Sequence, residues 1–397
     1  MDLLSKRITE LTESQTLAMA ARSRELIAKG IDVINLSLGE PDFLTPEHVR
    51  EAGKQAIDQG YSFYTPVAGY AETREAVVKK LARDNSLHYV ADQIVTSTGA
   101  KQSIINVLLC LLNPGDEIII PTPYWVSYLS MVQLAEGKAV LVAAGVEQDF
   151  KITPAQLEAA ITQKTKAFLF SSPCNPTGSV YTRGELEGLV AVFERYPQII
   201  VISDEIYEYI NFEGPHESIA SIGNMIERTV VVNGLSKGFA MTGWRFGYIA
   251  APLEIAKACI KLQGQFTSAT CSITQRAAIA ALTGDLAPTF EMREAFRRRR
   301  KLVLDGLGQI TNLRCNEPTG AFYVFPDVSR FFGKKYNTNV IHNADDLATY
   351  LLVEGHVAVV TGEAFGAPDC IRLSYATSDQ KLQIALERMK KALGNLH

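Results

Sequence analysis

A lysine in the middle of the chain has the surroundings of a residue that does covalent chemistry. Lys237 lies in the segment 234–247 (GLSKGFAMTGWRFG), directly after the β-branched run 229–233, and Arg245 follows eight positions later. An amine held where a strand ends in a loop attacks a carbonyl when its pKa is lowered. The segment therefore predicts a Schiff-base enzyme.

The same residues fit a second hypothesis. Segment 234–238 (GLSKG) matches G-x-S-x-G, the nucleophile elbow of serine hydrolases, and His342 or His356 could supply the base. This five-residue pattern arises often by chance, and it leaves the polar residues at the other strand ends without a role. A serine hydrolase is therefore the less favoured hypothesis.

Polar groups also follow two other strand-like runs, at the sheet edge where open parallel sheets place their sites. Asp204 ends the apolar run 199–204, and Asn175 lies between two prolines in the stiff loop after 167–171. One helical turn separates Asp204 from Tyr207, so we expect these two side chains to lie close together. An N-cap role for Asp204 and an ordinary turn at Asn175 are the structural alternatives.

A helix start after the run 94–98 is a candidate anion site. Gly99, Ala100 and Lys101 leave backbone N–H groups uncovered, and the helix dipole favours an anion there. A tight turn that needs glycine explains the same residues equally well. The P-loop pattern is absent and no G-x-G-x-x-G follows a strand, which argues against a nicotinamide dinucleotide.

Alternating strand-like and helical runs supply the scaffold for these groups. The nearly continuous apolar, β-rich runs occupy residues 94–98, 117–121, 139–142, 167–171, 199–204, 229–233 and 246–250. Amphipathic stretches of helical length, such as 101–112 and 182–196, separate several of them. This alternation predicts an α/β fold with a large, mostly parallel seven-stranded sheet between helices.

The two ends of the chain do not follow this alternation. Residues 1–45 hold one helical stretch and one short strand-like run, and the last third mixes long helices with short strands. We expect a large domain at 46–287 and a small α+β domain at 288–397, to which the N-terminal arm, 1–45, contributes.

Bulk composition excludes several functions. The net charge of −4 argues against nucleic-acid binding, and the basic run 297–301 is interpreted as a solvated helix face. Apolar runs fall short of the ~18 residues of a membrane span. Six histidines form no metal-binding pair, and six scattered cysteines indicate free thiols in a reducing compartment. We therefore expect no metal, no nucleic-acid partner, no membrane and a cytoplasmic location.

Taken together, these residues resemble those of the class I aminotransferases, in the aspartate aminotransferase superfamily and fold type I of the pyridoxal-phosphate enzymes. The resemblance spans nearly the whole chain and includes, besides segment 234–247, the motifs 37–43 (SLGEPDF), 64–69 (YTPVAG), 123–125 (PYW), 175–178 (NPTG), 203–207 (SDEIY) and 372–376 (RLSYA). Their order and separations are most similar to those of the bacterial subgroup Ib aspartate aminotransferases.

The resemblance implies a cofactor, pyridoxal 5'-phosphate, and a role for each strand-end residue. Lys237 would bind the cofactor covalently and move the proton during amino transfer. Asp204 would pair with the pyridine nitrogen and keep the ring an electron sink. Asn175 and Tyr207 would hydrogen-bond the phenolic oxygen of the ring, and Trp125 would stack on it.

The resemblance also implies a phosphate site. Ser236 and Arg245 would bind the phosphate together with the helix start at Gly99, Ala100 and Lys101, because arginine suits planar contact through several donors.

Residues outside the predicted sheet complete the implied site. Tyr64 would reach the phosphate of the neighbouring subunit, which implies a homodimer with shared active sites. Arg372 would bind the α-carboxylate of the substrate, assisted by Asn175 and the backbone of Gly39. Because Gly39 and Arg372 both belong to the predicted small domain, substrate binding would close that domain over the cofactor.

The side chain of the substrate is the open point. The resemblance implies Lys101 as the ligand of a distal carboxylate, with hydroxyl groups near Ser14 and Thr16. Many members of the subgroup have a basic residue and then a proline where this chain has Thr12 and Glu13, so a carboxylate stands near a site for carboxylates.

We expect ping-pong exchange between L-aspartate and 2-oxoglutarate. Prephenate, aromatic or neutral amino acids are alternative substrates. A pyridoxal-phosphate β-lyase and a non-enzymatic cofactor-binding regulator are alternative classes of protein.

Overall fold

One central sheet organises the middle of the chain. The computed structural model describes residues 3–11 and 15–397. Seven of the described strands form this sheet, in the order β2 (Ile94–Ser97), β8 (Gly247–Ala250), β7 (Thr229–Gly234), β6 (Ile200–Asp204), β5 (Thr165–Ser171), β3 (Glu117–Thr122) and β4 (Lys138–Ala143). Neighbours pair in parallel except at β8, which is antiparallel to β2 and β7. The predicted sheet is confirmed.

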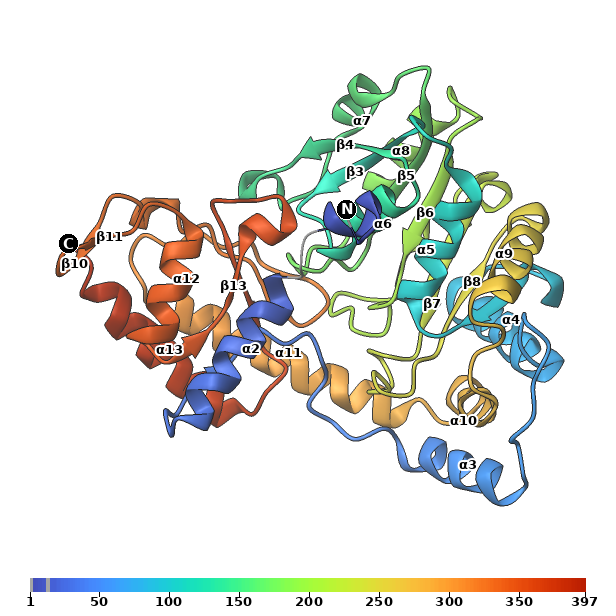
Figure 1. The fold of residues 1–397 in the computed structure, drawn as a ribbon, viewed down its shortest axis with the longest axis horizontal. Coiled ribbons are helices and arrows are strands. Elements are labelled where there is room, and N and C mark those ends of the chain that lie inside the picture. The colour runs from blue at the N-terminus through green and yellow to red at the C-terminus, as the bar shows by residue number, and fades with distance from the viewer. Residues whose placement is uncertain (1–2, 12–14) are drawn as a thin grey trace.

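Helices cover both faces of the sheet (Figure 1). One face packs against α5 (Ala100–Leu111), α6 (Ser127–Leu134) and α9 (Leu253–Phe266), and the other against α4 (Ala71–Asn85), α7 (Pro154–Ala160), α8 (Arg183–Phe193) and α10 (Ser272–Thr283). Because side chains alternate along a strand, Ile118 and Ile120 join the first layer and Ile119 joins the second. This double cover explains why the strands are almost continuously apolar.

Segments from both ends of the chain build a second part, which in Figure 1 holds the blue helix α2 and the orange to red elements, whereas the first helix, 6–9, lies over α6 of the large part. β1 (Ile34–Asn35) pairs in parallel with β12 (Val357–Ala358). An antiparallel sheet has the order β13 (Val360–Thr361), β14 (Ile371–Ser374) and β9 (Tyr323–Val324), and a hairpin joins β10 (Lys335–Tyr336) to β11 (Asn339–Val340). The helices of this part are α2 (Gln15–Ala28), α12 (Ala344–Val353) and α13 (Asp379–Gly394).

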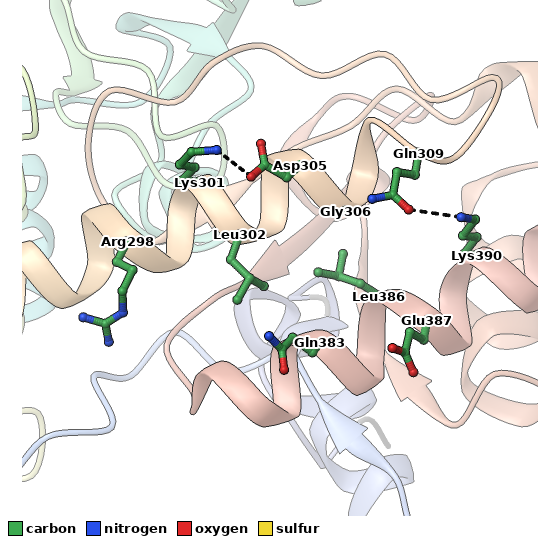
Figure 2. A pocket seen from close by; sticks show the side chains of 10 residues that line it. All are labelled: Arg298, Lys301, Leu302, Asp305, Gly306, Gln309, Gln383, Leu386, Glu387 and Lys390. Carbon is green, nitrogen blue, oxygen red and sulfur yellow. Dashed lines mark hydrogen bonds and ion pairs between the residues drawn. The ribbon is translucent and has the colours of Figure 1, made fainter.

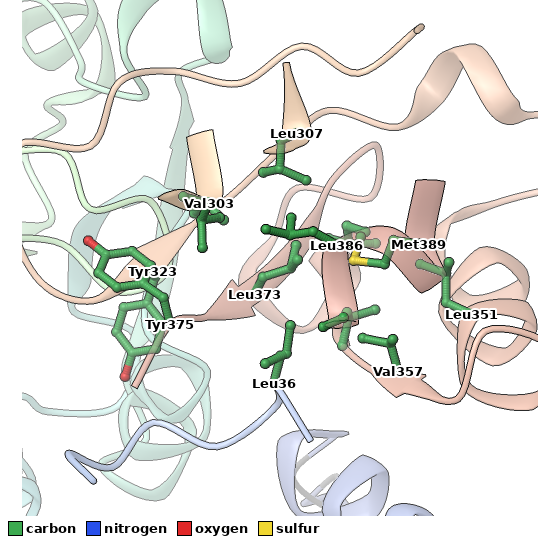
Figure 3. Close-up of a cluster of buried hydrophobic side chains, with 14 of the residues drawn as sticks. Leu36, Val303, Leu307, Tyr323, Leu351, Val357, Leu373, Tyr375, Leu386 and Met389 are labelled. Carbon is green, nitrogen blue, oxygen red and sulfur yellow. The ribbon is translucent and has the colours of Figure 1, made fainter. Parts of the chain in front are cut away.

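A shared apolar core joins the two ends (Figure 3). Leu36 of the N-terminal arm packs in one buried cluster with Val357, Leu373 and Met389 of the C-terminal third. Burial of this arm against distant residues removes its apolar surface from water, which an isolated arm of this length cannot do. The division at 45 and 287 remains a prediction.

The long helix α11 (Ala287–Leu307) runs between the two parts (Figure 1). Here the interpretation of the run 297–301 as a solvated face is wrong for Arg299 and Arg300. Arg299 binds Asp42 through both Nη atoms, at 2.7 and 2.9 Å, and Asp379 through Nε at 3.2 Å. Arg300 donates to the carbonyl of Pro318 at 2.9 Å. Partners far away in the sequence bury these charges, so the charge run itself does not reveal them.

The remaining elements are short or lie at the edge. The α-helices are α1 (Lys6–Thr9) and α3 (Glu47–Asp58), and 3₁₀ turns occupy Ala91–Gln93, Val146–Gln148, Ile219–Ser221, Met225–Glu227, Ser329–Phe331 and Gly362–Phe365. Every helix in the part of the chain that the structure describes is too short or too polar to cross a membrane.

Candidate active site

A cavity of about 440 Å³ lies at the carboxyl ends of β5, β6 and β7. The parallel register places Ser171 beside Asp204, and the loops after these strands form its floor. Most residues predicted from the sequence line this cavity: Gly39, Ala100, Lys101, Trp125, Asn175, Asp204, Tyr207, Ser236, Lys237, Arg245 and Arg372.

Lys237 presents a partly buried amine to the cavity. Its Nζ donates to the carbonyl oxygen of Gly39 at 2.5 Å and lies 5.7 Å from the ring centre of Tyr207. Burial lowers the pKa of Lys237 to about 8, although the carboxylate of Glu40 acts in the opposite direction. About a tenth of the amine is therefore neutral at pH 7, far more than for an ordinary lysine, and the neutral amine is the nucleophile toward a carbonyl.

Asp204 is buried at the end of β6, with a carboxylate held by two donors. The hydroxyl of Tyr128 donates to Oδ2 at 2.8 Å, and the backbone N–H of Ile206 donates to Oδ1 at 3.3 Å. Burial raises the pKa of Asp204 to about 6, against the opposing effect of the bond from Tyr128. A cationic partner in the cavity would therefore stabilise the ionised form of this carboxylate.

Arg372 and Asn175 meet at the opposite wall. The Nη1 atom of Arg372 donates to Oδ1 of Asn175 at 3.0 Å, and Nη2 donates to the carbonyl of Ser37 at 2.6 Å. Its Nε is buried without a hydrogen-bond partner, and among the described residues the acidic groups that act on this guanidinium are the phenols of Tyr323 and Tyr207 and no carboxylate. Burial accordingly lowers the pKa of Arg372. A buried arginine in this state suits a carboxylate ligand.

Arg245 and the start of α5 form the anion end of the cavity. Gly99 precedes α5 with a φ of +87°, and a Cβ atom there would overlap the guanidinium of Arg245. Arg245 also has a positive φ, of +54°, a conformation that is costly outside glycine and is often found at functional sites. Its Nη1 donates to the carbonyl of Thr242 at 2.9 Å. A guanidinium beside uncovered helix N–H groups is suited to phosphate.

Lys101 and Trp125 lie together on the outer wall. The Nζ of Lys101 is 5.1 Å from the ring centre of Trp125. Burial lowers the pKa of Lys101, and the charge of Arg245 lowers it further. The cation therefore has an aromatic neighbour and faces the same cavity as Arg372.

Some predicted residues do not line this cavity. Tyr64 is 97% exposed on a surface loop. Gly99 lies behind Arg245 and does not form part of the wall. Thr12, Glu13 and Ser14 lie outside the described residues, as does the side chain of Thr16.

The structure adds residues that sequence reasoning missed. Tyr128, Tyr323 and Glu40 all line the cavity. Tyr128 follows Trp125 by three positions, a spacing that could have placed both on one side of a helical turn. Glu40 lies within the motif 37–43, yet no residue near Tyr323 signals proximity to the site.

A more open hollow of about 600 Å³ lies between α11 and α13 (Figure 2). Two of its cations have partners in its own lining, since Lys301 pairs with Asp305 at 2.7 Å and Lys390 donates to Gln309 at 3.1 Å. None of the residues predicted for the site lines it. Among the residues described, no group of histidine, cysteine and carboxylate side chains is arranged to hold a metal.

The fold and this cavity define a class of enzyme in which a reactive amine and a site suited to an anion meet at the carboxyl ends of a parallel sheet. The family model "Aminotransferase class I and II" matches residues 31–389, and the chain belongs to this family.

Individual relatives are similar to this chain over nearly its whole length. The "Aspartate/prephenate aminotransferase" of Cereibacter sphaeroides is 47% identical, with 98% of each chain covered. The aspartate aminotransferase structure from Rhizobium meliloti has a TM-score of 0.97 at 42% identity, covering 100% of both chains. That of Thermus thermophilus with maleate has a TM-score of 0.93 at 41% identity, covering 99% of this chain and 100% of the other.

Proposed function

We propose that this protein is a pyridoxal-phosphate-dependent aminotransferase that moves an amino group from L-aspartate to 2-oxoglutarate by ping-pong exchange. One observation carries the proposal: a partly buried lysine with a lowered pKa shares a cavity with a buried carboxylate and with an arginine that has no carboxylate partner among the described residues. These are the groups that an aldehyde cofactor with a basic ring nitrogen, and then an amino acid, require.

The residues present fit the cofactor. When bound, pyridoxal phosphate supplies an aldehyde carbon and a ring that withdraws electrons. Lys237 holds it covalently and moves the proton at the α-carbon of the substrate. Asp204 keeps the ring nitrogen protonated. Burial raises the pKa of Asp204, so a cationic ring nitrogen beside it stabilises its carboxylate. Asn175 and Tyr207 bind the ring hydroxyl.

The phosphate and the ring face have their own ligands in this proposal. Arg245, Ser236 and the N–H groups of Ala100 and Lys101 bind the phosphate, as the close approach of Arg245 to Gly99 supports. The N–H of Gly99 itself donates to the carbonyl of Ser97 at 2.8 Å, so Gly99 supplies the space for Arg245 rather than a donor. Trp125 covers one face of the ring.

The two carboxylates of the substrate meet the two cationic walls. Arg372 binds the α-carboxylate with Asn175 and the backbone of Gly39. Lys101 binds the distal carboxylate, which favours aspartate and 2-oxoglutarate over neutral acids. The names of the relatives support aspartate, and those named aspartate/prephenate aminotransferases make prephenate the second candidate.

We also infer a cytoplasmic homodimer in which each site is shared. Tyr64 and its neighbour Phe63 are 97% and 83% exposed, and Phe266 is 69% exposed, as expected of aromatic side chains that a second copy covers. In this dimer Tyr64 contacts the phosphate of the partner subunit. The free cysteines fit a reducing compartment.

We further propose that 288–397 and most of residues 1–45 move together as a small domain over 46–287, while the start of the arm stays on the large part, where Arg7 pairs with Glu136 at 3.1 Å. Gly39 and Arg372, on the moving side, bind the substrate carboxylate, so binding closes the cavity and excludes water.

The first experiment measures the visible absorption of the purified protein with added pyridoxal phosphate. The wild type is expected to show the band of covalently bound cofactor, and Lys237→Ala is expected to lack it. A screen of amino acids without any 2-oxo acid follows, in which aspartate converts the cofactor stoichiometrically to its amine form. A β-lyase would instead release product without that conversion, and an unchanged band in Lys237→Ala would refute the proposal.

Mixing variants tests the shared site. Tyr64→Ala and Lys237→Ala subunits are unfolded and refolded together, which yields mixed dimers with one site that retains both residues. A gain of activity above both parents is expected. No gain would mean that Tyr64 acts within its own subunit or outside the site.

A further inference from the structure

Tyr323 lies between Tyr207 and Arg372 in the cavity. It belongs to β9, where it pairs with Ser374 of β14. Side chains two positions apart share a face of a strand, so Tyr323 lies on the same face as Arg372. The side chain is fully buried yet lines the cavity.

The hydroxyl of Tyr323 has two close neighbours. It lies 2.8 Å from the hydroxyl of Tyr207, with the two rings edge to face at 5.8 Å. It also lies against Gly39, where a Cβ atom would overlap it. Glycine at position 39 therefore leaves room for this hydroxyl, and the position of the arm depends on it.

The direction of the bond between the two hydroxyls follows from their protons. Tyr207 has one hydroxyl proton, and a Tyr207 that donates to the ring oxygen of the cofactor must accept from Tyr323. Burial raises the pKa of both phenols, so both keep their protons, and the donor in this bond is set by what the hydroxyl of Tyr207 contacts. Successive hydrogen bonds polarise one another. A hydrogen bond donated to the hydroxyl of Tyr207 therefore strengthens the hydrogen bond that Tyr207 donates to the cofactor.

The ring of Tyr323 has a separate neighbour. The guanidinium carbon of Arg372 lies 4.7 Å from the centre of this ring, and a second ring, that of Phe365, lies at 4.9 Å. The two aromatic faces hold the guanidinium in the cavity while leaving its N–H groups for a ligand.

We infer that Tyr323 is a positioning residue for both halves of the site, its hydroxyl orienting Tyr207 toward the cofactor and its ring supporting Arg372 for the substrate carboxylate. The inference rests on the proposed function and extends it to a residue in the last third of the chain. The two roles belong to different atoms, so two substitutions separate them.

Tyr323→Phe removes the hydroxyl and keeps the ring. A donor to the ring oxygen stabilises its deprotonated form, so a weakened donor raises the pH midpoint of the visible spectrum of the bound cofactor. The midpoint is expected to rise in Tyr323→Phe, by less than in Tyr207→Phe. The affinity for maleate, measured by calorimetry, stays close to that of the wild type.

Tyr323→Leu removes both the hydroxyl and the aromatic ring. The midpoint rises as in Tyr323→Phe, and the affinity for maleate falls on the order of fivefold as the cation–aromatic contact is lost. Tyr350→Phe is the matched control, because its hydroxyl donates to the carbonyl of Ala392 at 2.7 Å, away from the cavity. It is expected to change neither readout.

The outcomes separate the two claims. An unchanged midpoint in Tyr323→Phe, with or without a change in Tyr207→Phe, overturns the role of the hydroxyl. Equal maleate affinity in Tyr323→Phe and Tyr323→Leu overturns the role of the ring. A wild-type protein with no visible band refutes the proposed function itself, while the maleate comparison still decides the role of the ring.

Discussion

The Nζ atom of Lys237 and the carbonyl oxygen of Gly39 lie 2.5 Å apart, although 198 residues separate them in the chain. The amine that is expected to hold the cofactor thus contacts the arm that is expected to bind the substrate. Both belong to one cavity only because the N-terminal arm packs into the core of the C-terminal third.

The pH dependence of cofactor capture follows from the surroundings of Lys237. With a pKa of about 8, roughly a tenth of the amine is neutral at pH 7, so capture of pyridoxal phosphate by cofactor-free protein should speed up through pH 8 and then level off. Because Glu40 raises this pKa, Glu40→Gln should move the midpoint down. Stopped-flow absorption measures both, and a rate that climbs steadily through pH 10 would contradict the prediction.

Tyr128 should protect cofactor binding at low pH. Its hydrogen bond opposes the upward shift of the Asp204 pKa, so Tyr128→Phe raises that pKa further. The carboxylate is lost as pH falls through the pKa, and the variant should therefore release the cofactor at a higher pH than the wild type. Dialysis at stepped pH, followed by the absorption of the retained cofactor, measures this. Coincident retention curves would leave Tyr128 a packing role.

Gly99→Ala should weaken the phosphate site. The added Cβ displaces the guanidinium of Arg245, and the loss of a charged hydrogen bond of this kind costs about tenfold or more in cofactor affinity. Gly115→Ala is the control for backbone strain, since Gly115 has nearly the same φ, +89° against +87°, but open space around it. Titration with pyridoxal phosphate compares the two. Equal affinities of the two variants for pyridoxal phosphate would show that phosphate binding does not depend on the close contact between Arg245 and Gly99.

Two cationic side chains should divide the recognition of the substrate. Arg372→Ala is expected to lower kcat/KM for every amino acid, because each carries an α-carboxylate. Lys101→Ala is expected to lower it roughly tenfold or more for aspartate, with little effect for alanine. Half-reaction rates with both amino acids measure the difference. A similar loss with aspartate and alanine would assign Lys101 to the phosphate or to the fold.

Neighbouring arginines of α11 should differ in their effect on stability. Arg299 has a side chain only 8% exposed and binds Asp42 through two hydrogen bonds, so Arg299→Ala leaves a carboxylate without its partner and costs about 3 kcal/mol. Arg298, 63% exposed, shares the partner Asp379, and Arg298→Ala should cost less than about 1 kcal/mol. Urea unfolding of the wild type and of both variants measures these differences in stability. Equal midpoints for the two variants would contradict the prediction.

Local patterns are enough to predict the central sheet and the functional residues at its ends. Strands buried on both faces must be apolar along their whole length, so each one stands out locally, and the polar residue after it marks the edge of the sheet. Lys237, Asp204 and Asn175 were found in this way. The seven motifs then identified the family, which the match over residues 31–389 confirms.

The side chains that support those residues come from distant parts of the chain, and they are known only from the three-dimensional packing. Tyr128 lies against Asp204 across 76 positions, Tyr207 against Tyr323 across 116, and Arg299 against Asp42 across 257. Local patterns report whether a side chain faces a core, but not which partner it meets there. That choice is made when the two ends of the chain bury a common apolar core and bring β9, β14 and the N-terminal arm to the edge of the central sheet.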